Sequence, residues 1–188
     1  MTTVRTADQQ AEFDRMQQYY QSQGERYSFS ELWPRASKAR LELLDALDGV
    51  SEEHSTWAPG NGDWSIKEVA VHILNSSRNT RRLVQALSSG KSGDSSGVET
   101  PRETTDTPLE ALRNQLRDDG IEWSAALLAL PPRPPLEPTA PHSMFGELHA
   151  RAWYLFQRTH DQDHRGQVEA VKAAPGYPGA AGSSGGAS

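Results

Sequence analysis

Two histidines near the C-terminal end of the sequence have the spacing of a metal-binding pair. His160 and His164 lie in the segment LFQRTHDQDHRGQVEAVKAA, which predicts a helix. In an α-helix, residues i and i+4 differ by about 40° around the axis and by about 6 Å along it, so their side chains point the same way. Two imidazoles held in this way can bind one divalent cation, and the sequence therefore predicts part of a metal site that needs a further ligand.

The residues around this pair indicate that both histidines face the protein interior. Steps of three and four residues along the segment trace a mostly apolar face, which contains Trp153, Phe156, His160, His164, Gln167 or Val168, and Val171. Buried imidazoles need a hydrogen-bond partner or an ion, and two adjacent ones repel each other if both are charged. A shared metal meets both conditions, although an HxxxH pattern also occurs by chance on solvated helix faces.

A third histidine, His72, is the candidate for the missing ligand. The run from Trp64 to about Leu87 predicts a second amphipathic helix, and His72 lies on its apolar face. A lone histidine in such a position is more often a hydrogen-bonded core residue. Three histidines with open positions for water or substrate, however, describe a catalytic metal site, so the predicted metal ligands are His72, His160 and His164.

The other three histidines are weaker candidates for ligands. His149 lies on the same side of its helix as His160, but about 16 Å away along the axis, so we expect it to pack or cap locally. His54 lies in the polar segment SEEHSTW and His142 in a Pro-rich loop. Both are expected to be exposed or structural, although a loop histidine can still fold over a site.

The composition argues against several classes of function. The 188 residues contain no cysteine, so sulfur chemistry would need a thiol from a cofactor or substrate. A net charge of -6 argues against a nucleic-acid surface. No run approaches the roughly 20 apolar residues that cross a bilayer, and the N-terminus lacks the apolar core of a secretory signal. We therefore expect a soluble, cytoplasmic protein that acts on a small-molecule substrate, with no nucleic-acid or membrane partner.

Four apolar patterns of helical period predict an all-α fold, a four-helix bundle. The helices are expected at about residues 28–47, 64–87, 107–130 and 144–173, with Asp63 or Ser65 as the N-cap of the second and Thr107 as that of the third. The Gly/Ser-rich residues 88–106 are longer than antiparallel neighbours need, which predicts a crossover that makes the second and third helices parallel. No segment shows the period of a β-strand.

The expected domain organisation is one bundle with an appendage at each end. Residues 28–174 form the bundle, in which the Pro-rich segment PPRPPLEPTAPHS is a stiff connector. Residues 1–27 are an N-terminal helical appendage, whose apolar contacts are Phe13, Met16, Tyr19 and Tyr20. Residues 175–188 are a flexible tail, since they are too poor in apolar groups to pack as a regular element.

Two segments together resemble the DinB/YfiT-like superfamily of four-helix-bundle metal-binding proteins. DWSIKEVAVHIL is similar to that family's Trp-Ser-x-x-Glu-x-x-x-His helix, and MFGELHARAWYLFQRTHDQDHRGQVEAVKAAPGYP is similar to its closing His-x-x-x-His helix followed by Gln. The resemblance covers about residues 28–178. It implies an up-down-down-up bundle and gives the ligand role to His72, His160 and His164. The chain has PHSMFG where relatives often have His-Pro-x-Phe-Gly, which leaves the place of His142 open.

The resemblance also implies a range of functions. Characterised relatives look like transferases and isomerases that use the thiols mycothiol or bacillithiol, and other members resemble metal-dependent hydrolases. We therefore expect a divalent ion, zinc or nickel before iron or manganese, that activates a low-molecular-weight thiol or water for transfer to a small electrophile. The alternatives are a hydrolase and a non-catalytic, metal-stabilised bundle that binds a small molecule or a partner. A homodimer is implied by the resemblance alone.

Several polar residues near the predicted ligands are candidates for lining a pocket or for holding an imidazole. They are Glu68, Asn75, Asn79, Gln157, Asp161, Asp163 and Gln167. Each has an alternative role as a satisfied polar group of the bundle. Because ligating histidines must be neutral, metal affinity is expected to fall below about pH 6.

Overall fold

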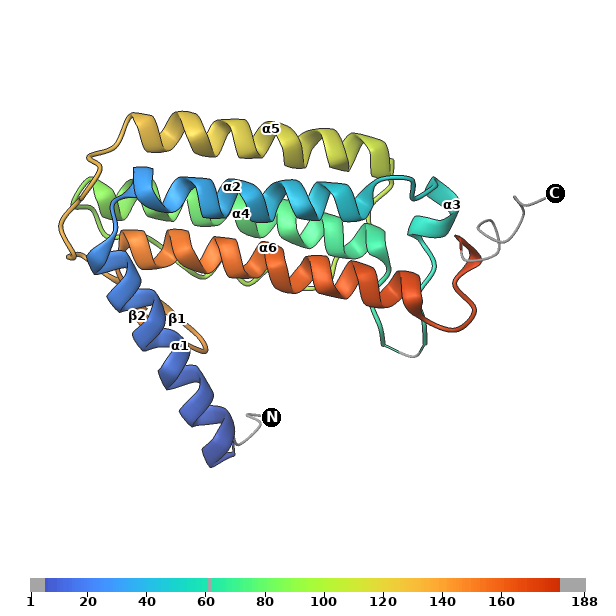
Figure 1. The fold of residues 1–188 in the computed structure, drawn as a ribbon, viewed down its shortest axis with the longest axis horizontal. Helices are drawn as coiled ribbons and strands as arrows, with labels where there is room; N and C mark the ends of the chain where they lie inside the picture. The colour runs from blue at the N-terminus through green and yellow to red at the C-terminus, as the bar shows by residue number, and fades with distance from the viewer. Residues whose placement is uncertain (1–5, 61, 180–188) are drawn as a thin grey trace.

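The computed structural model describes residues 6–60 and 62–179. Within these ranges the chain forms six helices and one small hairpin (Figure 1). In chain order the elements are α1 (Ala7–Arg26), α2 (Phe29–Leu47), α3 (Glu52–Ser55), α4 (Ile66–Ser88), α5 (Leu109–Leu128), β1 (Ala140–His142), β2 (Gly146–Leu148) and α6 (Ala150–Ala173). The expected all-α class is confirmed, with the hairpin as an unpredicted addition.

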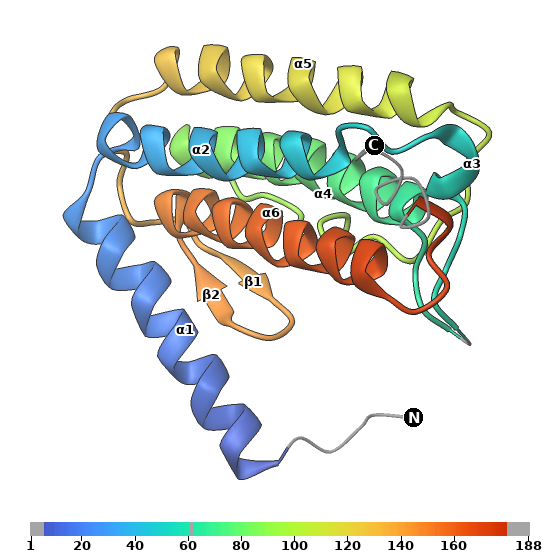
Figure 2. The same ribbon diagram turned by 45° about the vertical axis from the view of Figure 1, so that its right-hand side comes forward.

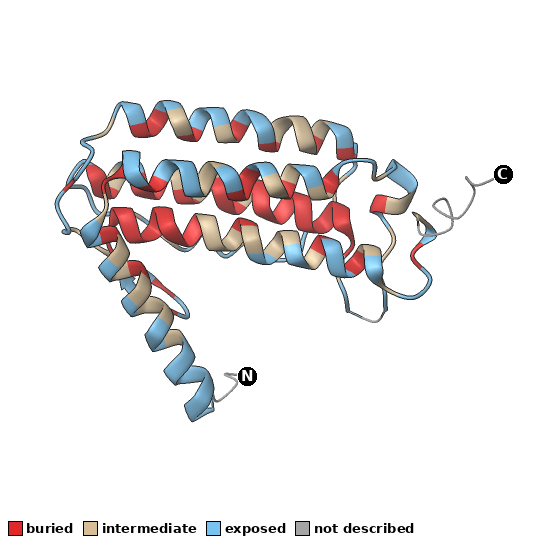
Figure 3. Ribbon diagram, in the orientation of Figure 1, coloured by how far each residue is buried: buried red, intermediate tan, exposed pale blue. Residues whose placement is uncertain are grey.

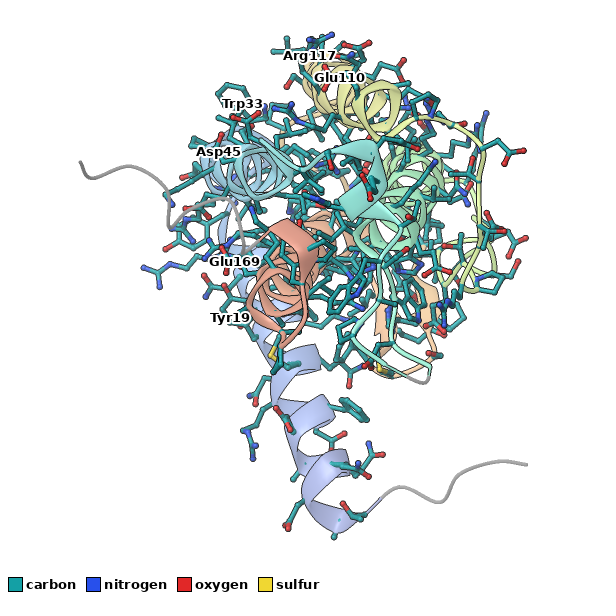
Figure 4. The ribbon with its side chains drawn as sticks, turned by 90° about the vertical axis from the view of Figure 1, so that its right-hand side faces the viewer. Tyr19, Trp33, Asp45, Glu110, Arg117 and Glu169 are labelled. Atoms are coloured by element: carbon teal, nitrogen blue, oxygen red, sulfur yellow. The ribbon has the colours of Figure 1, made fainter. Side chains whose placement is uncertain are left out.

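Helices α2, α4, α5 and α6 form a four-helix bundle. Figure 1 shows that α4 and α5 run in one direction and α2 and α6 in the other, which is the expected up-down-down-up order. Seen end-on in Figure 4, the helices follow one another around the bundle as α5, α2, α6 and α4. The segment between α4 and α5 returns along the bundle, so the predicted crossover is present.

The bundle core is built from the apolar faces of these helices, and α4 is buried along most of its length (Figure 3). Leu43, Ile73, Leu116 and Val168, one from each bundle helix, lie in one core cluster and have essentially no exposed surface. Burying each such side chain stabilises the fold by about 1.5–3 kcal/mol relative to leaving it in water. The interface of α4 with α6, where the predicted ligands lie, is thus part of a packed core.

The start of α4 is fixed by a capping box. The Ser65 hydroxyl accepts from the Glu68 amide at 3.3 Å, and the Glu68 carboxylate accepts from the Ser65 amide at 2.8 Å. Ser65 rather than Asp63 is therefore the N-cap, and His72 follows about two turns later.

Helix α5 starts one residue later than predicted. Thr107 is not its N-cap, and the actual cap residue, Pro108, makes no side-chain bond. The Glu52 carboxylate instead accepts from the Leu109 amide at 2.6 Å, so a partner 57 residues away satisfies this helix end.

The prediction that the last helix begins at Met144 is wrong. Strands β1 and β2 pair with Ala140 opposite Leu148, and Gly146 has the positive φ of +66° that the tight turn needs. Helix α6 begins only after His149, whose side chain accepts from the Ala152 amide at 3.3 Å. Each strand has three residues, which is too short for a period of two to be visible in the sequence.

Helix α1 diverges from the bundle, and its C-terminal half lies against α6 and the hairpin (Figures 1 and 2). The Tyr20 hydroxyl lies 2.6 Å from that of Thr159 on α6, and the Gln21 amide donates to the Glu147 carbonyl at 2.6 Å. The first turns of α1 are exposed (Figure 3). The appendage was expected at residues 1–27, and its described part, residues 6–27, thus packs on the bundle at one end.

Packing at the other end of the chain reaches beyond α6. Tyr177 is buried and contacts the ring of Trp57 at a centroid distance of 5.6 Å. This residue lies inside the segment 175–188 that was expected to be a flexible tail, while residues 180–188 lie outside the described part. The domain boundaries themselves stay predictions.

None of the described helices combines the length and the apolar character that spanning a membrane requires.

Candidate metal centre

The structure brings all three predicted ligands together at the interface of α4 and α6. The Nε2 atom of His160 lies 3.1 Å from that of His72 and 3.0 Å from that of His164. The three candidate ligand atoms all lie within 4.8 Å of one another. Three nitrogens bound to a tetrahedral ion at about 2.0–2.1 Å are separated by roughly 3.4 Å, so small adjustments of the rings would accommodate such an ion.

Two of the three rings are oriented by partners on their other nitrogen. Nδ1 of His72 lies 3.0 Å from the carbonyl oxygen of Thr100 and 2.8 Å from the hydroxyl of the same residue. The carbonyl oxygen can only accept, so it favours the tautomer in which this nitrogen carries the proton. Nδ1 of His164 likewise lies 2.8 Å from the side-chain oxygen of Gln167. In both rings Nε2 therefore presents its lone pair to the centre of the cluster, which is the form that binds a cation.

The third ring has no such partner. Nδ1 of His160 is buried and makes no hydrogen bond to any residue that the structure describes. Binding a cation through Nε2 would place the proton of His160 on this nitrogen. The protein thus favours one tautomer of His72 and of His164, while the tautomer of His160 depends on what occupies the centre.

The histidines are held in their neutral form. Burial, and after it the neighbouring charge of His164, lowers the pKa of His72 to about 4, against the opposing effect of its bond to the Thr100 carbonyl. Burial also lowers the pKa of His164, partly opposed by the bond to Gln167, and it lowers that of His160 well below the ordinary value. The three rings are therefore ligands in the unprotonated state near neutral pH, and they begin to protonate at a lower pH than free imidazole would.

Aromatic rings flank the cluster, and solvent reaches part of it. The ring of Trp64 meets His72 edge-on at a centroid distance of 5.1 Å, and Phe156 lies 5.3 Å from His160. His72 is buried, whereas His160 and His164 are partly exposed. An ion bound here would have apolar walls on one side and an approach from water on the other.

Among the other polar candidates on α4 and α6, Gln167 contacts a predicted metal-binding histidine, His164. Three candidates on α4 are bonded elsewhere. Glu68 closes the cap of α4 and pairs with Arg102 at 2.7 Å. Asn75 donates to Glu103 at 3.0 Å, and Asn79 donates to the Gly97 carbonyl. These three residues thus have the alternative role of satisfied polar groups.

Asp161 and Gln157 belong to a second polar cluster, centred on Arg40. The five N–H groups of Arg40 donate to Asp161 (twice), Asp119, Ser77 and the Leu116 carbonyl, at 2.9–3.2 Å. Gln157 donates to Asp161 at 2.9 Å. This Arg40 cluster joins α2, α4, α5 and α6, and it was not predicted.

The remaining histidines lie outside the metal centre. His149 caps α6, as expected of a local role. His142 is buried and stacks on Phe145 at a centroid distance of 4.6 Å, while its Nδ1 accepts from the Met144 amide. His54 contacts the edge of the Tyr177 ring. The expectation of exposed or structural roles for His54 and His142 agrees with these positions.

Thr100 is the residue near the site that the sequence analysis missed. It belongs to the crossover, which was read only as a connection between helices. No spacing rule relates it to His72, since the two residues are 28 positions apart and one lies in irregular chain. The one available signal was the unusual length of the crossover, because long ordered loops often serve a site.

A four-helix bundle with a three-histidine cluster between α4 and α6 defines the class of protein, and comparison with known families agrees. The sequence model of the DinB superfamily matches residues 35–168, and the chain belongs to this superfamily. The match contains His72, His160 and His164. The chain is also similar to YuaE of Bacillus subtilis (strain 168), described as an uncharacterized protein, with 26% identity over 165 residues that cover 72% of this chain and 94% of that one.

Proposed function

We propose that this protein is a divalent-metal-dependent enzyme that activates a low-molecular-weight thiol for transfer to a small electrophile. The observation that carries the proposal is the convergence of three Nε2 atoms, two of which present lone pairs because Thr100 and Gln167 bind the opposite nitrogens. Unprotonated acceptors that face one another repel, so this arrangement is stable only when a hydrogen-bond donor or a cation lies between them.

The donor set favours ions that accept imidazole, with zinc or nickel ahead of iron and manganese. When bound, such an ion keeps its double positive charge and lowers the pKa of a thiol or water in an open position. Thr100 and Gln167 would hold the rings in place. The apolar rings of Trp64 and Phe156 exclude water from one side, while the exposed side near His164 admits substrate.

The thiol must come from outside, because the chain contains no cysteine. The family resemblance supports mycothiol or bacillithiol. In the reaction, sulfur forms a bond to the electrophilic carbon, the bond from that carbon to its leaving group breaks, and the thiol proton passes to solvent. A cytoplasmic location, where such thiols stay reduced, belongs to the same proposal, as does a homodimer.

The test is turnover by the full chain loaded with Zn²⁺ or Ni²⁺. Mycothiol or bacillithiol is mixed with 1-chloro-2,4-dinitrobenzene, and release of chloride is followed together with formation of the thioether. We expect His160→Ala to abolish turnover and His54→Ala, a histidine outside the cluster, to retain it. Turnover that survives in His160→Ala would overturn the proposal.

Two other outcomes distinguish the alternatives. Cleavage of ester or amide substrates by the metal-loaded protein without any thiol, lost in His160→Ala, would replace thiol transfer by hydrolysis. Bound metal that raises the melting temperature while neither reaction occurs would identify a non-catalytic, metal-stabilised bundle.

A further inference from the structure

A groove separate from the metal centre runs between α2 and α5. It has a volume of about 290 Å³, and a neighbouring hollow of about 290 Å³ continues it past Trp33 and Ser124. Figure 4 shows α2 and α5 on the side of the bundle away from the interface of α4 with α6, with Trp33 and Arg117 labelled on the two helices that border the groove. An inference about this groove is therefore independent of the proposed function.

The walls of the groove are apolar and remain exposed. Trp33 and Leu41 on α2 face Ile121 on α5, and their exposed fractions are 43%, 60% and 63%. Large apolar side chains that line a hollow favour a flat, apolar ligand. The Trp33 indole donates to Ser124 at 2.9 Å, which holds this ring in place at the mouth.

The floor of the groove is polar but carries no unbalanced charge. Arg40 lines it, yet all five of its N–H groups are already bonded. Asp161 accepts from Arg40 and from Gln157. A charged ligand would find no free counter-charge on this floor and would have to lose its hydration, and Arg117 at the border of the groove is already paired with Asp118 at 3.1 Å. The groove therefore favours a neutral molecule.

Two groups on this floor are left without partners. The side-chain amide nitrogen of Gln157 donates to Asp161, which settles the orientation of the amide and leaves its oxygen, Oε1, buried with no hydrogen bond within the described residues. The Tyr154 hydroxyl, three residues earlier on α6, also makes no hydrogen bond in the described chain. Residues three apart are neighbours on a helix surface, so both groups can serve one ligand edge.

We propose that this groove binds a neutral, planar aromatic molecule with a lactam-type edge. Its N–H would donate to Gln157 Oε1 and its carbonyl would accept from the Tyr154 hydroxyl, while the ring lies between Trp33 and Ile121. Such a ligand satisfies the two open polar groups and covers the exposed apolar walls at once.

Gly120 supports this assignment and provides a test. It lies in the middle of α5, where glycine destabilises a helix, and it lines the groove. A Cβ atom added there would meet only Arg40 Cγ, at the ordinary contact distance of 3.5 Å. A larger side chain at this position can therefore fill the groove without disturbing the helix.

The experiment is calorimetric titration of the full chain with 2-quinolone and with N-methyl-2-quinolone, which has the same rings and carbonyl but no N–H. We expect saturable binding of one 2-quinolone per chain and binding of the methylated probe that is weaker by about tenfold. Gly120→Leu should abolish binding, whereas Gly166→Leu, at an exposed glycine with open space around it, should not change it.

Two further variants test the polar edge. Tyr154→Phe removes only a hydroxyl without a partner, so the fold should persist while 2-quinolone binds about fivefold more weakly. Gln157→Leu should make the two probes bind equally. Equal binding of both probes to the wild-type chain, unchanged binding in Gly120→Leu, or a wild-type dimer that Gly120→Leu converts to a monomer would each overturn the proposal, the last by showing that a second copy of the chain covers the groove.

Discussion

Two polar clusters lie side by side in this bundle, and they differ in how their hydrogen bonds are completed. In the Arg40 cluster every donor of the guanidinium meets an acceptor of the protein itself. In the histidine cluster three Nε2 atoms face one another, and only their outer nitrogens find partners, at two rings of three. The neighbours Asp161 and His160 belong to different clusters. The guanidinium of Arg40, whose donors are all satisfied by the protein, holds helices together, whereas the open Nε2 atoms of the histidine cluster are placed to receive a ligand.

The largest expected effect is on the fold and comes from Arg40→Leu. This change leaves Asp161 buried without its cation and removes one of the two cations of Asp119, which keeps Arg81 at 3.3 Å. It should lower the free energy of unfolding by about 3–5 kcal/mol. Urea denaturation measures it. Arg113→Leu breaks pairs whose acidic partners are exposed and should cost less than about 1 kcal/mol. Equal losses in the two variants would remove the distinction between a structural cluster and a surface ion pair.

In the histidine cluster, a substitution is expected to change metal binding strongly and the stability of the metal-free fold only slightly. His164→Ala should weaken Zn²⁺ binding by more than about 100-fold, since even the outer partners of a ligand contribute about 10–100-fold. The metal-free protein should unfold at nearly the same urea concentration as the wild type, because burial already disfavours the charged form of this ring. Competition with a chromophoric chelator measures the affinity. A variant that keeps its affinity for Zn²⁺ contradicts the assignment of this ligand.

A smaller effect is expected from Gln167→Leu. Loss of the acceptor for Nδ1 of His164 frees the ring to rotate and to change tautomer, so Zn²⁺ affinity should fall by about tenfold. The same chelator competition applies. Gln162→Leu on the same helix serves as the control, and a comparable loss there would mean that Gln167 has no special part in orienting the ring.

The smallest expected effect is on the pH dependence of the free energy of unfolding. It concerns His149, a buried histidine outside the metal centre. Burial lowers the pKa of His149, whose side chain must stay unprotonated to cap α6. The unfolded chain therefore binds this proton more readily, and the free energy of unfolding should fall as the pH drops below about 6.5. His149→Asn keeps a good N-cap and removes the titrating group, so unfolding curves of the metal-free protein should show a weaker pH dependence. An unchanged slope would exclude His149 as its source.

Much of the histidine cluster could be predicted from the sequence, because its ligands obey the helical period. His160 and His164 share a helix face, and His72 lies on the apolar face of another helix. The parallel arrangement of the second and third helices could also be predicted, since the long connection between them suggested a crossover. The hairpin could not be predicted, because its strands are too short to show a pattern.

The Arg40 cluster left a signal that was not used. Arg40 lies at helical spacing between Ala36 and Leu43, and Asp119 lies likewise between Leu116 and Trp123. A charged residue on an apolar face indicates a buried partner of opposite charge. Which residues pair could not be read from one sequence, however, because the partners come from separate helices, up to 121 positions apart.

The wide separation of His72 and His160 along the chain has a mechanical consequence. These rings are 88 positions apart, and an ion bound by both would act as a reversible cross-link that closes a large loop of the unfolded polypeptide. Such a cross-link would reduce the conformational entropy of the denatured chain much as a disulfide does. In a protein without cysteine, a chelator would then remove this cross-link as a reductant removes a disulfide.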